Sequence, residues 1–411
     1  MQGSEPNGRR RPIIVQKYGG SSVADVEKLG RVADRVVAAK RAGNDVVVVV
    51  SAMGKTTDGL LSLARQVASQ AGGAADPPRR ELDMLLSTGE RVSMALLSIA
   101  IQARGEAAIS FTGSQSGILT NDRHFDARII EVRPHRIEDE LARGQIVIIA
   151  GYQGMSYRRE ITTLGRGGSD TTAVALAAAL EAERCEIYSD VDGVYSADPR
   201  VVPDAKHLPE LDHAMLQEMA ESGAKVLCAQ AVEWARRANI AIYARSTFDA
   251  EDEGARQTVV RKFGPREDLR ARAVVGEGNV ALGSLADVAR LDDLLRVAGE
   301  AKVPLKDLAV NERGASFVVS LLNVPDWRGA KQRLTGALPS LALVEDVAVV
   351  SVVGDGLAAT TEPLVRFLAA LRGVSATPSA LTATPLRLSA VVPASALAEA
   401  QRTLHHAFVE S

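Results

Sequence analysis

The sequence predicts an α/β fold in its first two-thirds, with a mostly parallel, open sheet between helix layers, followed by a smaller α+β region. Short apolar runs such as residues 45–51 are rich in valine without polar alternation, which is typical of strands buried on both faces. These runs alternate with stretches whose apolar residues recur at helical spacing, so helical crossovers join parallel strands. At 411 residues the chain is long enough for two or three domains.

The first strand is expected at residues 13–17, and the first helix from Ser21 or Ser22, as its cap, to about Lys40. Further strands are expected at residues 45–51, 107–111, 145–150, 185–189 and 240–244. Further helices are expected at residues 59–69, 80–104, 137–143, 168–182, 212–221 and 225–238. Together these elements make one α/β domain, predicted to span residues 12–248.

A change of pattern follows at residues 249–270, where eleven charged residues occur with two glycines and a proline. This composition predicts a linker between domains. Beyond it the strand and helix signals fit two weak repeats of β-α-β-β-α-β type, residues 271–346 and 347–411, which share a shape more than a sequence.

Composition excludes several classes of protein. The 48 Lys and Arg residues nearly balance the 51 Asp and Glu residues, so no nucleic-acid partner is expected. The apolar runs, such as residues 46–50 and 173–180, are far shorter than the roughly 18 residues of a membrane helix. Two cysteines, Cys185 and Cys228, make neither a disulfide framework nor a zinc site, and neither is assigned a role. These features predict a cytoplasmic protein without a membrane partner.

The first candidate site is Val-Gln-Lys-Tyr-Gly-Gly-Ser-Ser at residues 15–22, where a strand delivers Lys17 to a glycine turn. Glycines let the backbone approach an anion, and a helix start supplies free N–H groups, so the segment suits a phosphate. A capped turn with its lysine in solvent explains the same residues, and both interpretations stay open at this point.

The second candidate is Thr-Thr-Leu-Gly-Arg-Gly-Gly-Ser-Asp-Thr-Thr at residues 162–172. Arg166 offers a bidentate fork for a carboxylate or phosphate, and Asp170 lies in the first helical turn, where it could orient a lysine or a metal. The alternative is a glycine turn capped by Asp170, but that leaves Arg166 without a structural task. A binding function is therefore favoured here.

Two further segments are weaker. The acidic loop Tyr-Ser-Asp-Val-Asp-Gly-Val-Tyr-Ser-Ala-Asp-Pro-Arg at residues 188–200 suits a nucleotide base and ribose with Lys225 nearby, or is a charged surface loop. Leu-Ser-Thr-Gly-Glu-Arg at residues 86–91 places Glu90 on a helix, where a lone glutamate is usually solvated.

Taken in order, these segments, together with Val-Val-Val-Ser-Ala-Met-Gly-Lys-Thr-Thr-Asp at residues 48–58 and Phe-Thr-Gly-Ser-Gln-Ser-Gly-Ile-Leu-Thr at 111–120, resemble the aspartate kinase family, actinobacterial type. The resemblance covers residues 13–248. It implies the amino-acid kinase fold and transfer of the ATP γ-phosphoryl group to the β-carboxylate of L-aspartate, giving 4-phospho-L-aspartate. ATP and Mg²⁺, the metal held through the ATP phosphates rather than by protein ligands, are the implied cofactors.

The resemblance also implies roles for individual residues. Lys17 would neutralise the transferred phosphoryl group, and Asp170 would position Lys17 or the substrate amino group. The aspartate-binding residues would be Ser51, Thr57, Glu90, which pairs with the ammonium, and Arg166, which holds the α-carboxylate. The ATP-binding residues would be Lys17, Gly19, Gly20, Ser21, Ser189, Asp190, Tyr195, Arg200 and Lys225. Such a reaction needs positioning and charge stabilisation but no general base, because the attacking carboxylate is already ionised.

In this family the C-terminal third forms two ferredoxin-like ACT domains that bind lysine or threonine and pair into dimers or dimers of dimers. Here neither repeat carries the family's Pro-Gly after its first strand: the equivalent segments begin at Ala281 and Val353. We therefore expect a homo-oligomer with weakened or lost feedback inhibition by lysine and threonine. Three rivals remain: a kinase for glutamate, acetylglutamate or carbamate, which the motif details disfavour; a kinase for a modified aspartate; and a non-catalytic sensing paralogue.

Overall fold

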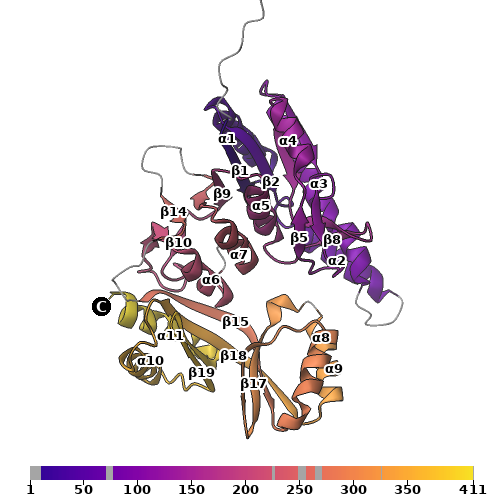
Figure 1. Ribbon diagram of the computed structural model, residues 1–411. Helices are drawn as coiled ribbons and strands as arrows, with labels where there is room; N and C mark the ends of the chain where they lie inside the picture. Colours follow the sequence, from indigo (N-terminus) through magenta and orange to yellow (C-terminus); the bar gives the residue numbers. More distant parts are fainter. Residues whose placement is uncertain are drawn as a thin grey trace, which may run out of the picture. The chain divides into compact units, whose positions relative to one another are not determined.

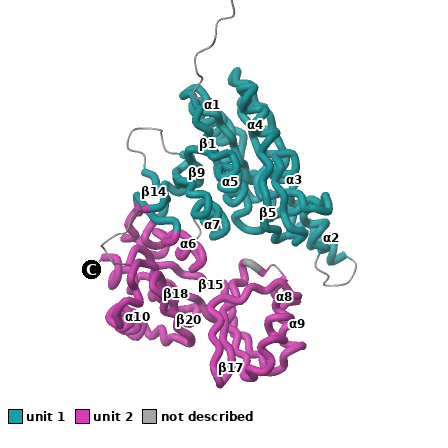
Figure 2. Tube along the Cα trace, in the orientation of Figure 1, with its two compact units in different colours: residues 1–194, 209–213, 227–262 teal, residues 195–208, 214–226, 263–411 magenta. Residues whose placement is uncertain are grey.

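The structure is a computed structural model that describes residues 11–70, 77–224, 227–248, 256–263, 271–324 and 326–410. The chain forms two compact units, coloured separately in Figure 2. Unit 1 comprises residues 1–194, 209–213 and 227–262, and unit 2 comprises residues 195–208, 214–226 and 263–411. Each unit is described by itself below.

Unit 1 is built on an eight-stranded sheet in the order β12-β14-β13-β9-β1-β2-β6-β3. Its strands are β1 (Ile13–Tyr18), β2 (Asp45–Val50), β3 (Ala108–Phe111), β6 (Ile146–Ala150), β9 (Arg184–Ser189), β12 (Glu210–Leu211), β13 (Ile242–Ser246) and β14 (Gln257–Val260). The central strands β13, β9, β1, β2, β6 and β3 are mutually parallel. The mixed α/β fold with a largely parallel sheet is therefore confirmed.

Helices cover both faces of this sheet, as Figure 1 shows. The helices on the sheet are α1 (Val26–Arg41), α3 (Arg79–Gln102), α4 (His135–Ala142) and α5 (Gly168–Ala179), while α2 (Thr56–Ser69) packs against α3 and α7 (Ala229–Ala238) packs against α5. One face buries alternate strand residues such as Val46, Val48 and Val50 against α1 and α3. Since successive strand residues point to opposite faces, the odd-numbered Val47 and Val49 lie on the other face, which α5 covers.

The start of the first helix differs from the prediction. The helix begins at Val26, and its cap is Asp25, whose carboxylate accepts a hydrogen bond from the Lys28 N–H at 2.8 Å. Ser21 and Ser22 instead lie in a turn, and the Ser22 hydroxyl lies 2.6 Å from the Thr247 hydroxyl. The helix begins after Asp25 because the carboxylate of this residue accepts a hydrogen bond from an otherwise unpaired N–H in the first helical turn.

Sequence patterns missed a second, four-stranded sheet in unit 1, in the order β5-β4-β7-β8. Its strands are β4 (Ile118–Thr120), β5 (Ile129–Val132), β7 (Gln153–Ser156) and β8 (Ile161–Thr163). Three or four residues are too few for periodicity to reveal, and pairing with neighbours stabilises them. This small sheet leads into the glycine-rich segment before α5.

Unit 2 contains a six-stranded antiparallel sheet in the order β16-β17-β15-β18-β20-β19. Its strands are β15 (Ala271–Leu285), β16 (Lys306–Asn311), β17 (Gly314–Ser320), β18 (Leu341–Gly354), β19 (Ala380–Thr384) and β20 (Arg387–Pro393). Its helices are α8 (Leu291–Glu300), α9 (Trp327–Ala337), α10 (Glu362–Gly373) and α11 (Leu397–His405). The long strands β15 and β18 each contribute residues to two separate hydrophobic cores. One core includes α8 and α9, and the other includes α10 and α11.

Short elements complete the two units. They are the β10–β11 ladder (Val194–Tyr195 with His207–Leu208), α6 (His213–Glu221), the 3-10 helices Val288–Arg290, Leu321–Asn323 and Ala394–Ala396, and a π-helical turn at His406–Glu410.

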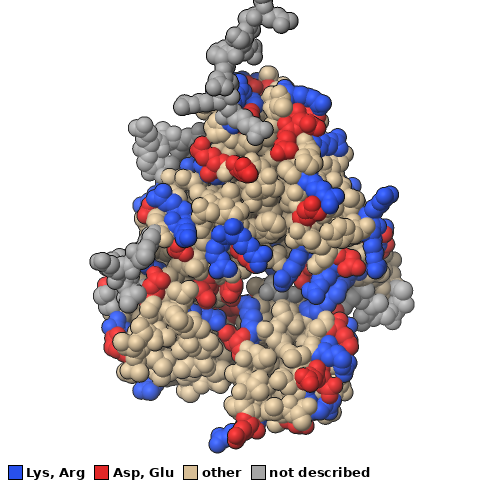
Figure 3. Space-filling model, viewed as in Figure 1, with Lys and Arg blue, Asp and Glu red and all other residues tan. Residues whose placement is uncertain are grey.

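Helix α3 is the one described helix that is long and apolar enough to cross a membrane, by those two criteria alone. Half of its apolar window is buried in the protein, where Met94, Leu97 and Ile101 join the core beside α1. On the face seen in Figure 3, Lys and Arg side chains are interspersed with Asp and Glu.

Candidate active site

The candidate site lies where the central parallel strands of unit 1 end. Tyr18 pairs with Val50, Val50 with Ala150, and Tyr18 with Tyr188, so β1, β2, β6 and β9 end at the same edge of the sheet. Ligands of open α/β sheets bind beyond the carboxyl ends of the strands. The turns that follow these strands carry several of the residues selected from the sequence.

Lys17 and Asp170 form the charged centre of this edge. The Lys17 ammonium lies 2.6 Å from the Asp170 carboxylate, and each side chain is only 11% exposed. Lys17 reaches Asp170 because an odd-numbered position on β1 faces α5, whose first turn carries the aspartate. The lysine is therefore not the solvated side chain of the alternative interpretation.

The turn after β1 packs against the turn after β2. The Gly54 N–H donates to the Gly20 carbonyl at 3.0 Å, and the Ser51 N–H donates to the Tyr18 carbonyl at 3.1 Å. A Cβ at Gly20 would lie 2.8 Å from the Ala52 carbonyl oxygen, so this close approach requires glycine.

Glu90 lies beside the same turn, on the buried face of α3. Its Oε1 accepts a hydrogen bond from the Ala52 N–H at 3.1 Å, whereas its Oε2 is buried and has no hydrogen-bond partner among the described residues. Burial raises the pKa of Glu90 to about 7, against the smaller opposing effect of backbone hydrogen bonds. A buried carboxylate oxygen without a donor is costly and calls for a cationic partner.

The glycine-rich segment forms a tight loop between β8 and α5. Gly165 and Gly167 have φ values of 75° and 68°, in the left-handed region that favours glycine, and Arg166 lies exposed between them. The helix begins immediately at Gly168, so its free N–H groups lie at the site as the sequence predicted for this segment. A Cβ at Gly167 would collide with Cys228, whose thiol donates to the Gly167 carbonyl at 3.2 Å.

Tyr152 is a site residue that the sequence interpretation missed. It follows β6 with φ of 67°, an unusual conformation for a bulky residue, and its ring packs close to Gly168. Burial raises the pKa of Tyr152 to about 12, with Glu90 and Asp83 adding to the effect and a hydrogen bond with Thr163 and the charge of Arg166 opposing it. Its position directly after a buried parallel strand was the available signal.

The other selected residues of unit 1 fall on neighbouring turns. Ser51 follows β2, Thr57 is the second residue of α2, and both are half-buried. Ser189 ends β9, and its hydroxyl contacts the N–H and the carbonyl of Val191, while Asp190 and Ser21 are exposed.

The remaining nucleotide candidates are not brought to this edge by the described part of unit 1. Tyr195 and Arg200 belong to unit 2, where Arg200 forms a bidentate pair with Asp198. Lys225 lies outside the described residues. Cys185 is fully buried on β9, and burial raises the pKa of its thiol.

The edge of the sheet therefore carries the buried cation of Lys17, backbone N–H donors at the glycine turns and at the start of α5, and the Glu90 carboxylate with one unpaired oxygen. Such a set binds and orients charged reactants without a covalent nucleophile. The described residues contain no cluster of three or more His, Cys, Asp or Glu that could hold a metal ion.

Comparisons with known proteins agree with this geometry. The sequence model of the amino acid kinase family matches residues 12–246. The chain is 42% identical to the aspartokinases of Mycolicibacterium smegmatis over 410 residues and Corynebacterium glutamicum over 415 residues, with 96% of each chain covered in both cases. It also superposes on Escherichia coli aspartokinase III, solved in complex with aspartate and ADP, with a TM-score of 0.82 and 25% identity over 96% of this chain and 99% of that one. Because the identity extends over the whole length and the fold is shared, the chain belongs to the aspartokinase family, the ATP-dependent kinases within the amino acid kinases, and resembles its actinobacterial members.

Proposed function

We propose that the chain transfers the γ-phosphoryl group of ATP to the β-carboxylate of L-aspartate, giving 4-phospho-L-aspartate. One observation carries the proposal most directly: the buried Lys17–Asp170 pair and the unpaired Oε2 of Glu90 lie at the same strand ends. A cation for the phosphoryl group and an anion for an ammonium are what this pair of substrates requires.

Aspartate is gripped by its two α-substituents. Oε2 of Glu90 accepts a hydrogen bond from the substrate ammonium, which is the donor that this buried carboxylate oxygen lacks. The Arg166 fork holds the α-carboxylate, and the Ser51 and Thr57 hydroxyls orient the substrate beside it. The β-carboxylate is thereby left as the nucleophile, ionised at neutral pH without a general base.

ATP is placed with its γ-phosphoryl group at Lys17. The ammonium offsets the charge that spreads over the phosphoryl oxygens, and backbone N–H groups at Gly19, Gly20 and Ser21 donate to the phosphate chain. Asp170 keeps Lys17 aimed at the site through their 2.6 Å ion pair. The nucleotide itself is assigned to Ser189, Asp190, Tyr195, Arg200 and Lys225.

Magnesium ions would be coordinated at this site by the phosphates of ATP rather than by protein side chains. The donor set described around Lys17 is cationic and backbone N–H, with Asp170 already paired, so the ATP phosphates would carry the metal. When bound, Mg²⁺ neutralises charge on the phosphate oxygens.

The domain division and the assembly are proposals of the same kind. We assign residues 12–248 to the kinase domain, 249–270 to a linker, and 271–346 and 347–411 to two ACT-like domains; the family match over residues 12–246 supports the first boundary. Exposed apolar residues on the two edge strands of the six-stranded sheet, Leu308 and Val310 on β16 and Leu381 on β19, support pairing into a homodimer or a dimer of dimers. A cytoplasmic location is proposed with the metabolic activity.

Weakened feedback inhibition by lysine and threonine is also proposed. It is supported by the segments that begin at Ala281, within β15, and at Val353, near the end of β18, because neither carries the Pro-Gly pair of the family's effector loops.

The test is acyl-phosphate formation from MgATP and L-aspartate, trapped as the hydroxamate, with and without lysine plus threonine. Product formation at the same rate with and without lysine plus threonine supports both the kinase activity and the weakened feedback. Strong joint inhibition retains the kinase and refutes weakened feedback. Absence of product from aspartate refutes the proposed substrate and directs attention to a modified aspartate.

A further inference from the structure

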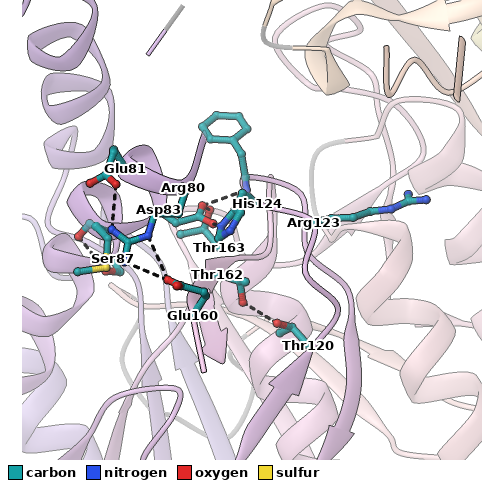
Figure 4. A network of polar contacts seen from close by, with 12 residues as sticks. Arg80, Glu81, Asp83, Ser87, Thr120, Arg123, His124, Glu160, Thr162 and Thr163 are labelled. Carbon is teal, nitrogen blue, oxygen red and sulfur yellow. Dashed lines mark hydrogen bonds and ion pairs between the residues drawn. The ribbon is translucent and has the colours of Figure 1, made fainter. Parts of the chain in front are cut away.

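A buried carboxylate outside the reacting centre joins three elements of unit 1. Asp83 lies on α3 with no solvent exposure. Its Oδ1 accepts hydrogen bonds from the Thr163 hydroxyl at 2.5 Å and the Phe125 N–H at 3.0 Å, and its Oδ2 lies 2.6 Å from Nδ1 of His124. Figure 4 shows these side chains converging from α3, the 121–126 loop and β8.

Two of the three elements lead to a residue of the proposed aspartate site. On α3, Asp83 and Glu90 are seven residues apart, so both lie on the same buried face two turns from each other. Thr163 ends β8, and Arg166 follows three residues later. Asp83 is therefore the point at which the elements carrying Glu90 and Arg166 are bonded together.

The 121–126 loop supports the same glycine turn from its other side. The Ala127 N–H donates to the Thr163 carbonyl at 2.9 Å, and a Cβ at Gly165 would lie 3.1 Å from the Asp126 carboxylate. Phe125 has φ of 72°, a costly conformation for a bulky residue that persists only where its surroundings hold it. Asp83 holds it, by accepting the Phe125 N–H.

We infer that Asp83 and His124 are positioning residues that fix the spacing of Glu90 and Arg166, the groups that grip the ammonium and the α-carboxylate of aspartate. This inference rests on the proposed function of those two residues. Neither Asp83 nor His124 touches the substrate; they act through Thr163, the loop and α3. Small displacements of binding groups weaken oriented binding strongly, by up to about 100-fold for about 1 Å.

The expected signature is a change that concerns aspartate alone. Asp83→Asn, His124→Asn and Thr163→Val each raise the KM for aspartate, by about 10- to 100-fold in the first case, while the KM for ATP stays unchanged. The reason is that the network does not contact Lys17 or its glycine turn. Thr163→Ser, which keeps the hydroxyl that reaches Asp83, restores the KM for aspartate.

The chain offers matched controls on the same elements. Thr162 is equally buried on β8, but its hydroxyl lies 2.6 Å from Thr120 instead of Asp83, so Thr162→Val removes a comparable hydrogen bond without touching the network. Glu160→Gln removes the exposed ion pair between Glu160 and Arg80, whose side chains approach to 3.0 Å. This ion pair also joins α3 to the residue that directly precedes β8. Both controls are expected to keep the wild-type KM for aspartate.

The experiment measures KM for aspartate, KM for ATP and the melting temperature of each full-length variant. The Thr163 hydroxyl also makes a hydrogen bond with Tyr152, so His124→Asn is the variant that tests the Asp83 network separately. A raised KM for aspartate in both Thr163→Val and His124→Asn but not in Thr162→Val, at similar melting temperatures, supports the inference. A rise in Thr163→Val alone would assign the effect to Tyr152 and refute the inference. If wild type is active with aspartate and the Thr163→Val and His124→Asn variants lose only stability, the inference is wrong although the proposed function stands. If wild type gives no product from aspartate, the proposed function fails and takes this inference with it. His124→Asn, compared with Thr162→Val, tests the inference even where Asp83→Asn does not fold.

Discussion

Two buried glutamates, one in each unit, show how a binding site differs from a structural ion pair. Glu277 on β15 of unit 2 accepts a hydrogen bond from the Ser320 hydroxyl and lies 3.3 Å from the Lys306 ammonium. Glu90 of unit 1 is more deeply buried, has no cationic side chain paired with it among the described residues, and leaves Oε2 without a hydrogen-bond partner, while Oε1 accepts the Ala52 N–H at 3.1 Å. In the proposed function, the substrate ammonium supplies the partner that Oε2 of Glu90 lacks, whereas Glu277 already has its partners within unit 2.

The largest effect should come from the charged centre of unit 1. Lys17→Met removes the cation proposed to face the phosphoryl group, and acyl-phosphate formation should fall about 1,000-fold or more in kcat. The hydroxamate assay measures this, with circular dichroism as the check that the variant folds. A variant that keeps more than a tenth of the wild-type rate would contradict the assignment of Lys17.

Substituting the two glutamates tests the comparison directly. Glu90→Gln should raise the KM for aspartate by about 10- to 100-fold, because a charge-assisted hydrogen bond to the ammonium is lost. Glu277→Gln should leave that KM unchanged. Steady-state kinetics of the two variants side by side gives the result, and equal effects on KM would break the comparison.

Stability should respond in the opposite order. Without substrate, Glu90→Gln should raise the free energy of unfolding at pH 8 by about 2 kcal/mol, since it removes a buried unpaired charge. Glu277→Gln should lower it by about 1–2 kcal/mol, because Lys306 loses its carboxylate partner and keeps the Glu221 carbonyl. Urea denaturation measures both, and a destabilised Glu90→Gln variant would show that Glu90 is satisfied in the native state.

The raised pKa of Glu90 predicts a pH dependence of known sign. Burial raises it from 4.5 to about 7, so the folded state without substrate binds this proton more tightly than the unfolded state. This contribution to the free energy of unfolding is therefore present below pH 4.5 and is lost as pH rises from 4.5 to about 7. The KM for aspartate should rise as pH falls below 7, since protonated Glu90 no longer carries the charge that binds an ammonium. Glu90→Gln should abolish both trends in denaturation and kinetic profiles.

A further pair of substitutions compares glycines in the two units, and the smallest effect is expected at Gly299. Gly20→Ala places a Cβ 2.8 Å from the Ala52 carbonyl oxygen and should destabilise the protein by about 1–3 kcal/mol. Gly299→Ala, inside α8 of unit 2 with no described atom within 4 Å of the new Cβ, should stabilise it by about 0.5–1 kcal/mol. Thermal unfolding of both variants separates a glycine required by close approach from one that is not.

Sequence patterns predicted the long elements of unit 1 well because each carries its own periodic signal. The buried runs at β1, β2 and β6 and the amphipathic α1 were found within a few residues of their ends. The helix start at Asp25 was missed because Ser21, Ser22 and Asp25 are all good caps, and the chain direction after Gly20 decides between them. The short strands β4, β5, β7 and β8 were missed because their stability comes from pairing.

For the candidate site, the residue types were readable and their partnerships were not. Lys17 and Asp170 were each selected from a motif, but their 2.6 Å contact depends on β1 and α5 packing across one face of the sheet. Tyr152, Asp83 and His124 carry no motif of their own, and their importance follows only from contacts with residues 16 to 80 positions away along the chain.

The sequence by itself determined the α/β class, the family and the residues that provide charge, because buried strands, helical periodicity and glycine-rich motifs are local properties. Only the tertiary structure decided which charges are satisfied. It left Oε2 of Glu90 without a partner, paired Glu277 with Lys306 and bonded Asp83 of α3 to the 121–126 loop and to β8. The reason is physical: whether a buried polar group finds its hydrogen bonds depends on atoms brought close by the fold, from segments far apart in the chain.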